Sequence, residues 1–151
     1  MITGLQKYVG KTIRLRASSP KLQVHNTALM SALTPGSFET IRQEPHLWGR
    51  WVESAVGACL INSTIHRQYG LYYWREHNQE VDFVLTHHDK IVGIEVKSTH
   101  ISTGTSSGMK AFKDMAPSSS VIMVGEQGLP LERFFSMPLD QFALDHNFKY
   151  T

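Results

Sequence analysis

Hydrophobic residues recur at three- and four-residue steps in one long stretch of the chain, residues 47–67. Such spacing gives a helix one apolar face for burial. Pro45 stands just before the stretch, and Tyr69-Gly70 follows it, as expected at the two ends of a helix. We therefore predict a core-facing helix here. Its apolar stripe consists of Trp48, Trp51, Val52, Ala55, Cys59 and Leu60.

Four later stretches are short, rich in Val, Ile and aromatic residues, and bounded by turn residues, which is typical of strands. They are residues 71–75, 80–86, 90–97 and 121–125. Short turns join the first three, which predicts an antiparallel meander. A helical stretch at 109–115 leads to the fourth, so we expect it to pair in parallel with a meander strand.

The order helix, three strands, helix, strand predicts an α/β fold with a mixed central sheet flanked by helices. A chain of 151 residues corresponds to about one domain. We expect residues 39–151 to form that domain and residues 1–38 to be a basic leader or linker. Within the leader, residues 20–25 suggest a short strand, and a brief helix capped by Asn26 follows. A final helix is expected at 138–145.

Composition narrows the class of protein. Hydrophobic residues make up 41% and charged residues 19%, which describes a soluble globular protein rather than a disordered one. No apolar run is long enough to span a bilayer, and the first residues do not resemble a signal sequence. The single cysteine, Cys59, excludes an internal disulfide, so we expect a cytoplasmic protein.

Charge is distributed unevenly along the chain. The segment before Glu39 carries five basic and no acidic residues, so it contributes +5 to a total of +2. Clustered cations can bind nucleic-acid phosphates, or they can belong to a solvated terminus. The five residues are Lys7, Lys11, Arg14, Arg16 and Lys21.

Candidate chemistry lies on two successive predicted strands. Asp82 is on one strand, and Glu95 and Lys97 are on the next, where alternation gives the last two a common face. Two carboxylates and one amine suit a hard divalent cation with a polarised water, as in metal-assisted phosphodiester cleavage. The plain alternative is a surface ion pair at the rim of a sheet.

Two further carboxylates are candidates for the same place. Glu53 lies between Gly49 and Gly57 at helical spacing. These glycines either clear space around the carboxylate or allow a close contact between helix and strand. Glu80 shares the face of Asp82, where it either supports the site or pairs with Arg75.

An aspartate on one strand and Glu-x-Lys on the next resembles the PD-(D/E)XK nuclease superfamily. A narrower likeness covers roughly residues 19–145. It resembles the C-terminal, nuclease-like domain of unknown function in bacterial and archaeal AAA-type ATPases. An aspartate is usual in that domain where Asn26 stands here. The matching motifs are Ser19-Pro20-Lys21-Leu22, Gly49-Arg50-Trp51-Val52-Glu53, Tyr73-Trp74-Arg75, Glu80-Val81-Asp82-Phe83 and Ile94-Glu95-Val96-Lys97-Ser98.

The resemblance implies a restriction-endonuclease-like core and a nuclease acting on DNA rather than RNA, with Mg²⁺ or Mn²⁺ as cofactor. It assigns Asp82, Glu95 and the main-chain carbonyl of Val96 to the metal. Lys97 would be the catalytic lysine, and Glu53 would assist. It also implies an alternative, a catalytically silent binding or assembly module that is the C-terminal part of an AAA-type ATPase and associates with an ATPase subunit or with itself. The chain has no phosphate-cradling Gly-x-x-x-x-Gly-Lys-Ser/Thr motif of its own.

Overall fold

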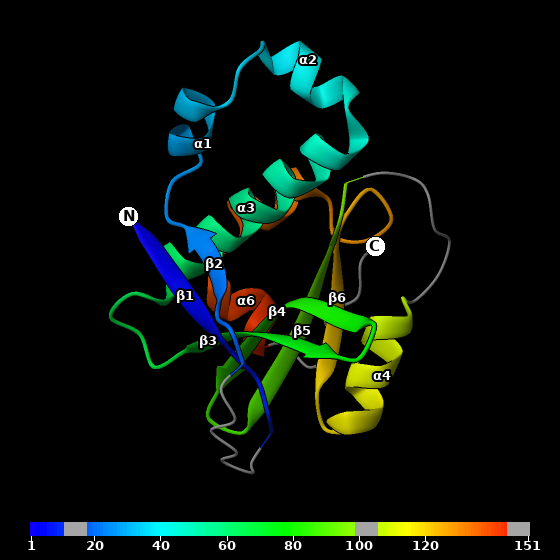
Figure 1. Cartoon of the computed structure of the whole chain (residues 1–151). Coiled ribbons are helices and arrows are strands. Elements are labelled where there is room, and N and C mark those ends of the chain that lie inside the picture. The colour runs from blue at the N-terminus through cyan, green and yellow to red at the C-terminus, as the bar shows by residue number, and fades with distance from the viewer. Residues whose placement is uncertain (11–17, 99–105, 145–151) are drawn as a thin grey trace.

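A six-stranded mixed sheet with the strand order β2-β1-β3-β4-β5-β6 lies at the centre of the computed structural model (Figure 1). The structure describes residues 1–10, 18–98 and 106–144. The pairs β1–β3 and β5–β6 are parallel, and the other neighbours are antiparallel. The strands are β1 (Ile2–Lys7), β2 (Lys21–Val24), β3 (Gly70–Glu76), β4 (Gln79–His87), β5 (Lys90–Lys97) and β6 (Ser120–Gly125).

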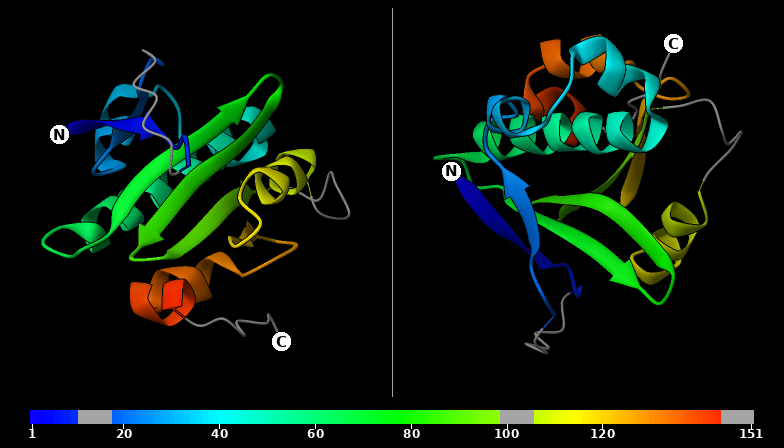
Figure 2. Two further views of the ribbon diagram at one scale, coloured as in Figure 1. Left: turned by 90° about the horizontal axis from the view of Figure 1, so that it is seen from below. Right: turned by 45° about the horizontal axis from the view of Figure 1, so that its top comes forward.

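Helices cover both faces of the sheet (Figure 2). The long α3 packs on one face together with residues of α5 and α6, whereas α4 packs on the other. The helices are α1 (Ala28–Leu33), α2 (Phe38–Gln43), α3 (Pro45–Thr64), α4 (Ser107–Met115), α5 (Leu131–Ser136) and α6 (Leu139–Leu144).

The predicted fold class is confirmed. The elements α3, β3, β4, β5, α4 and β6 follow the expected αβββαβ order, with an antiparallel meander and a parallel crossover to β6. Helix α3 starts at Pro45, where the missing N–H of proline costs nothing. It ends at Thr64 rather than near residue 67, and His66 has a left-handed backbone with φ +60°, which a helix cannot continue through.

Three elements were not predicted: β1, α2 and α5. Strand β1 buries only Leu5 among its six residues, so its hydrophobic pattern is weak. It is held instead by pairing, because it lies between β2 and β3 in the sheet. In α2 and α5 a single side chain each, Ile41 and Phe134, is buried. The prediction of a separate leader ending at residue 38 stays a prediction, although β1 and β2 both pair into the sheet.

The two faces of the sheet have different cores. Phe83, Leu85 and Ile94 pack with Val56 and Leu60 of α3 on one face. On the other face, Val81 and Val84 pack with Trp74 of β3 and with Phe112 of α4. Burial of large apolar side chains on both faces is the main contribution to the stability of such a sheet.

A β-bulge interrupts β4 where its candidate residues lie. Tyr72 pairs with Val84 and Trp74 with Val81, so β3 advances by two residues while β4 advances by three. The extra residue breaks the alternation, and Val81 and Val84 therefore share one core cluster although they are three apart. Phe83, the residue after Asp82, belongs to the core cluster on the opposite face of the sheet.

None of the described helices is long and apolar enough to cross a membrane. The predicted cytoplasmic location stays a prediction.

Candidate functional site

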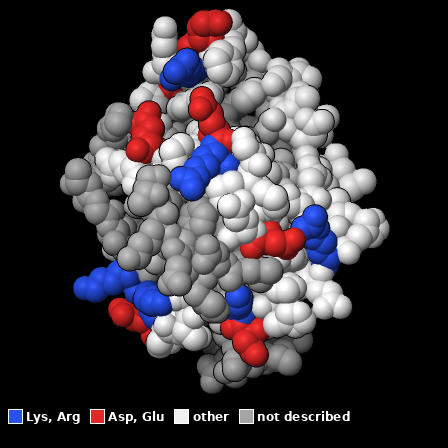
Figure 3. Space-filling view, turned by 180° about the vertical axis from the view of Figure 1, so that it is seen from behind, with Lys and Arg blue, Asp and Glu red and all other residues white. Residues whose placement is uncertain are grey.

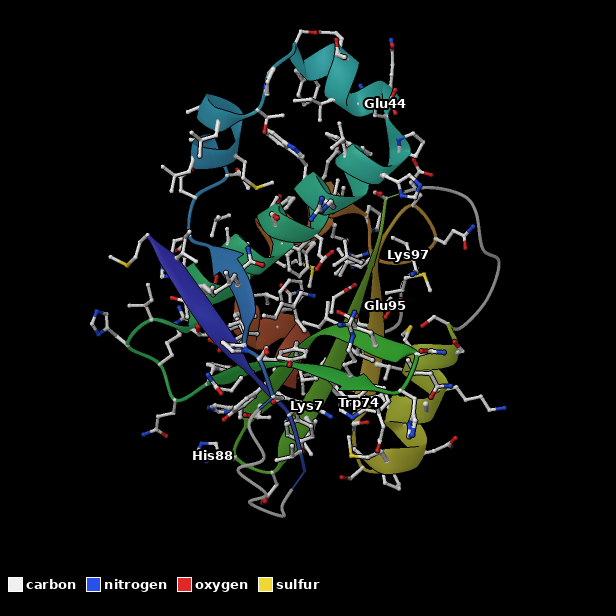
Figure 4. The ribbon with its side chains drawn as sticks, viewed as in Figure 1. Lys7, Glu44, Trp74, His88, Glu95 and Lys97 are labelled. Carbon is white, nitrogen blue, oxygen red and sulfur yellow. The ribbon has the colours of Figure 1, made fainter. Side chains whose placement is uncertain are left out.

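A pocket of about 430 Å³ brings the predicted site residues together. It lies where the ends of β4 and β5 meet the first half of α3, and Figure 4 shows Glu95 and Lys97 near the end of β5. All five predicted site residues line it, although they come from three different elements. The lining residues are Pro45, His46, Gly49, Arg50, Glu53, Glu80, Asp82, Glu95, Val96, Lys97 and Ser98.

The pocket lies beyond the end of the β4–β5 ladder. The last paired residues on this side are Phe83 and Ile94. Past them, the backbone N–H of Val96 donates to Oδ2 of Asp82 at 2.8 Å. A side chain thus takes the place of a backbone partner, and the strand ends are joined by a carboxylate that also faces the pocket.

Glu95 and Lys97 form an ion pair, as their common face predicts. Nζ of Lys97 lies 2.8 Å from Oε1 of Glu95. The Glu95 side chain is 8% exposed, whereas that of Lys97 is 37% exposed. Oε2 of Glu95 is buried and has no hydrogen-bond partner among the described residues. A buried carboxylate oxygen without a donor is costly, so this atom calls for a cationic or protic partner.

Lys21 of β2 is the site residue that sequence reasoning missed. Its Nζ lies 2.6 Å from Oε1 of Glu53 and 3.5 Å from both Oδ1 of Asp82 and Oε1 of Glu80. The same Nζ donates to the main-chain carbonyl of Asp82 at 3.3 Å. The motif Ser19-Pro20-Lys21-Leu22 pointed to this segment, but nothing in it indicated that the lysine contacts carboxylates that line the pocket.

Burial and neighbouring charges shift the protonation of the site. The pKa of Asp82 is raised to about 7 in total, because burial and the neighbouring carboxylates of Glu53 and Glu95 raise it by more than Lys21 lowers it. Burial lowers the pKa of Lys21, but Asp82 and Glu53 outweigh it, so the net shift is upward. The pKa of Lys97 is raised in the same way, chiefly through its contact with Glu95. Both lysines are therefore cations at neutral pH.

The two carboxylates at the edge of the site have different partners. Oε2 of Glu80 lies 2.6 Å from Nη2 of Arg75, and its Oε1 is within reach of Lys21. The predicted Arg75–Glu80 pair is confirmed, and the same carboxylate also borders the pocket. Glu53 is 31% exposed and holds Lys21.

Gly49 and Gly57, one on each side of Glu53 in α3, are close to different neighbours. A Cβ on Gly57 would lie 2.3 Å from Oε1 of Gln23, so this glycine permits the close contact of α3 with β2. Gln23 is buried and donates to the carbonyl of Ser54 at 2.9 Å. A Cβ on Gly49 would lie 3.3 Å from Oγ of Ser98, inside the pocket wall. The interpretation as a close contact between helix and strand therefore applies to Gly57, whereas a glycine that clears space around the Glu53 carboxylate stays a prediction.

Gly125 of β6 holds the backbone of the catalytic candidate Lys97. Its φ is +129°, and a Cβ there would lie 1.8 Å from the carbonyl oxygen of Lys97. Only glycine permits this approach. The end of β5 is thereby fixed on its β6 side.

The donor set fits a hard divalent cation. Mg²⁺ takes one or two carboxylates and leaves the remaining positions to water or phosphate oxygens. Asp82 and Glu95 offer two carboxylates, Val96 also lines the pocket, and Oε2 of Glu95 has no hydrogen-bond partner within residues 1–10, 18–98 and 106–144. In the described part of the chain, no group of three or more His, Cys, Asp and Glu side chains is arranged to hold a metal. Any metal here would therefore depend on two side chains and on solvent or substrate.

Three further lining residues were not assigned roles from the sequence. Arg50 and Ser98 belong to the same motifs as Glu53 and Lys97, but the sequence predicted no role for either of them. His46 had no sequence signal. His100, a candidate phosphate contact by its position after β5, lies outside the described residues.

No curated protein and no solved structure matches this chain. A family model does match, over residues 48–142. That stretch runs from the first turn of α3 to α6 and contains every predicted site residue, whereas Lys21 lies before it. By this match, the chain belongs to the family described as Domain of unknown function (DUF4143).

Proposed function

We propose that the pocket is the site of a metal-dependent nuclease of the PD-(D/E)XK type, which hydrolyses phosphodiester bonds of DNA. Asp82 and Glu95 would bind Mg²⁺ or Mn²⁺ together with the carbonyl of Val96. The observation that carries the proposal is the buried Oε2 of Glu95, in the wall of an acidic pocket, which has no hydrogen-bond partner in the described part of the chain. A divalent cation would supply the partner that this oxygen lacks.

The residues have distinct roles in this proposal. When bound, the cation would polarise a phosphate oxygen and acidify a water molecule. Lys97, which is partly exposed in the pocket, would offset the negative charge that develops on the phosphate. Glu53 would form an ion pair with its neighbour Lys21, and its carboxylate would add negative charge to the pocket.

Substrate contacts would come from the rim of the pocket. Arg50 is exposed there, and His46 lies on the first turn of the same helix. Among the described residues on the face in Figure 3, acidic and basic side chains are interspersed rather than gathered by sign. We therefore expect a local phosphate contact at the pocket. Lys11, Arg14 and Arg16 of the basic leader lie outside the described residues.

Calorimetric titration tests the metal site. Wild-type protein should bind Mn²⁺, and Glu95→Gln, which keeps the size of the side chain, should lose that binding. Lys110→Met, on the exposed surface of α4, serves as a control for handling and folding. If wild type and Glu95→Gln bind Mn²⁺ equally, Glu95 is not a ligand.

Cleavage of linear, single-stranded and branched DNA tests the reaction. Cleavage should require Mg²⁺ or Mn²⁺ and should fall by about 100-fold or more in Lys97→Ala, because a charge aimed at the transition state is removed. Lys110→Ala should cleave at the wild-type rate. Equal cleavage by wild type and Lys97→Ala would refute the nuclease proposal.

A second candidate function is a silent assembly module. It is favoured by an apolar pocket of about 340 Å³ on the outer side of α3, which could receive a side chain of a partner. Its aromatic lining residues are Phe38, Trp48, Trp51 and Phe135. Equal pull-down of an ATPase subunit by wild type and by the Asp82→Ala/Glu95→Ala variant would support this function. Loss of that pull-down in Phe135→Ser would localise the contact.

A further inference from the structure

Lys21 places one ammonium group among three carboxylates of the pocket. Its Nζ contacts Glu53, Asp82 and Glu80 at 2.6 to 3.5 Å. The side chain is 20% exposed, so this is not a solvated surface pair. An ammonium in this position neutralises acidic groups that would otherwise repel one another in a partly buried space.

The surroundings of Lys21 hold it in this position. Just before β2, the carbonyl of Ser19 accepts a hydrogen bond from the hydroxyl of buried Tyr73 at 2.8 Å. Just after Lys21, the buried Gln23 joins β2 to α3. The ammonium also lies 5.1 Å from the centre of the Phe83 ring, within the range of a cation–π contact. Both sides of the lysine are thus anchored to the core.

The two oxygens of Asp82 have different partners. Oδ2 accepts from the N–H of Val96, whereas Oδ1 faces Lys21. Oδ2 keeps a second lone pair, but Oδ1 is the oxygen that does not accept this backbone hydrogen bond, and it is the one that the ammonium contacts. A divalent cation on Oδ1 would lie beside the ammonium, and like charges at such short range repel strongly in a partly buried site.

We propose that Lys21 is the internal counter-cation of the metal-free pocket, and that a divalent cation binds by displacing the Lys21 ammonium from Asp82. This inference rests on the metal site of the proposed function. The segment before the family match thus controls the affinity of the site for metal. Lys21 acts as a positioning residue, since it competes for the carboxylates and does not itself bind the metal.

Calorimetry with Mn²⁺ tests the competition. Removing the competing charge in Lys21→Met should lower the Kd for Mn²⁺ by about tenfold or more. Lys110→Met removes the same charge outside the pocket and should leave the Kd unchanged, which controls for the net charge of the protein. An unchanged or higher Kd in Lys21→Met overturns the proposal.

A lysine footprint of the wild type gives a second measurement that does not depend on the folding of a variant. The protein is treated briefly with an acylating reagent, with and without Mn²⁺, and modification is read by mass spectrometry. Modification of Lys21 relative to Lys110 should rise severalfold when Mn²⁺ is present, because the displaced ammonium becomes accessible. A ratio that is the same with and without Mn²⁺ overturns the displacement.

The outcomes separate this inference from the proposed function. If wild type binds Mn²⁺ and Lys21→Met binds no more tightly, the displacement fails while the metal site stands. If Lys21→Met binds Mn²⁺ at millimolar concentration and wild type does not, the role of Lys21 as counter-cation is supported, and its ammonium keeps the metal out of the native pocket. If neither protein binds, the metal site and the displacement both fail.

Discussion

The backbone N–H of Val96 donates to Oδ2 of Asp82 at 2.8 Å and joins β5 to β4 just beyond the last pair of their ladder. This contact gives one carboxylate two functions. Oδ2 completes the hydrogen bonding of a strand end, and Oδ1 faces the lysine in the pocket. The strongest candidate ligand is therefore also part of the sheet, so its substitutions must be read for stability as well as for metal binding.

The first prediction concerns the pH dependence of stability. The pKa of Asp82 rises from 3.8 to about 7 on folding, so the folded protein binds this proton more tightly than the unfolded chain. Its contribution to stability is fully present below about pH 4 and is lost as the pH rises through 7. Between pH 5 and pH 8, we expect metal-free wild type to lose roughly 2 to 4 kcal/mol from this group.

Urea unfolding with chelator at both pH values measures this loss. Asp82→Asn cannot titrate, so its loss of stability between pH 5 and pH 8 should be smaller than that of wild type by the same amount. Comparing the two slopes cancels the contribution of other titrating groups. Parallel slopes for the two proteins would contradict the raised pKa of Asp82.

The second prediction concerns the contact between α3 and β2. In Gly57→Ala the new methyl group would meet the amide of Gln23, whose hydrogen bonds to Ser54 and Val24 would have to shift. Overpacking costs about 1–3 kcal/mol, and the better helix propensity of alanine returns about 1. We expect a net loss of up to about 2 kcal/mol in urea unfolding.

Gly49→Ala is the matched control on the same helix. Its methyl group would lie 3.3 Å from Oγ of Ser98, a contact that a small movement relieves. We expect its stability to equal or exceed that of wild type, because alanine favours the helix. Equal effects of the two substitutions would show that Gln23 does not restrict Gly57.

The third prediction concerns Gly125, the last residue of β6. Gly125→Ala combines a left-handed φ of +129° with a clash against the carbonyl of Lys97. Gly36→Ala has a similar φ of +114°, but its methyl group meets nothing closer than 3.8 Å. Backbone strain alone costs on the order of 1–3 kcal/mol. Thermal unfolding should show a loss within that range for Gly36→Ala and a clearly larger one for Gly125→Ala.

The fourth prediction concerns the anchor of Lys21. Tyr73→Phe removes the hydroxyl that donates to the carbonyl of Ser19 and keeps the buried ring. We expect a loss of about 1 kcal/mol, as for a typical buried hydrogen bond. Chemical denaturation measures it, and an unchanged midpoint would show that water replaces the hydroxyl at no cost.

Secondary structure was predictable wherever buried positions recur along the chain with the period of a helix or a strand. In residues 90–97, hydrophobic and polar positions alternate or form a continuous apolar run, as is typical of a strand, and β5 has these bounds. The stripe from Trp48 to Leu60 predicted most of α3. Its core-facing orientation was correct only in part, because Trp48, Trp51 and Ala55 are half-buried and line the apolar pocket, whereas Leu60 packs in the core. Strand β1 was not predictable, because it buries little and depends on neighbours that are distant in the chain.

By itself, the sequence determined the order of the core elements and indicated five residues that line one pocket, because both follow from local periodicity and residue type. Only the tertiary structure decided what surrounds Asp82. The bulge in β4 is a shift of register between strands, and Lys21 reaches the pocket from a strand 61 residues earlier. Neither leaves a local pattern, since each depends on how distant segments pack. The same packing brings the Lys21 ammonium to the carboxylates of Glu53, Glu80 and Asp82.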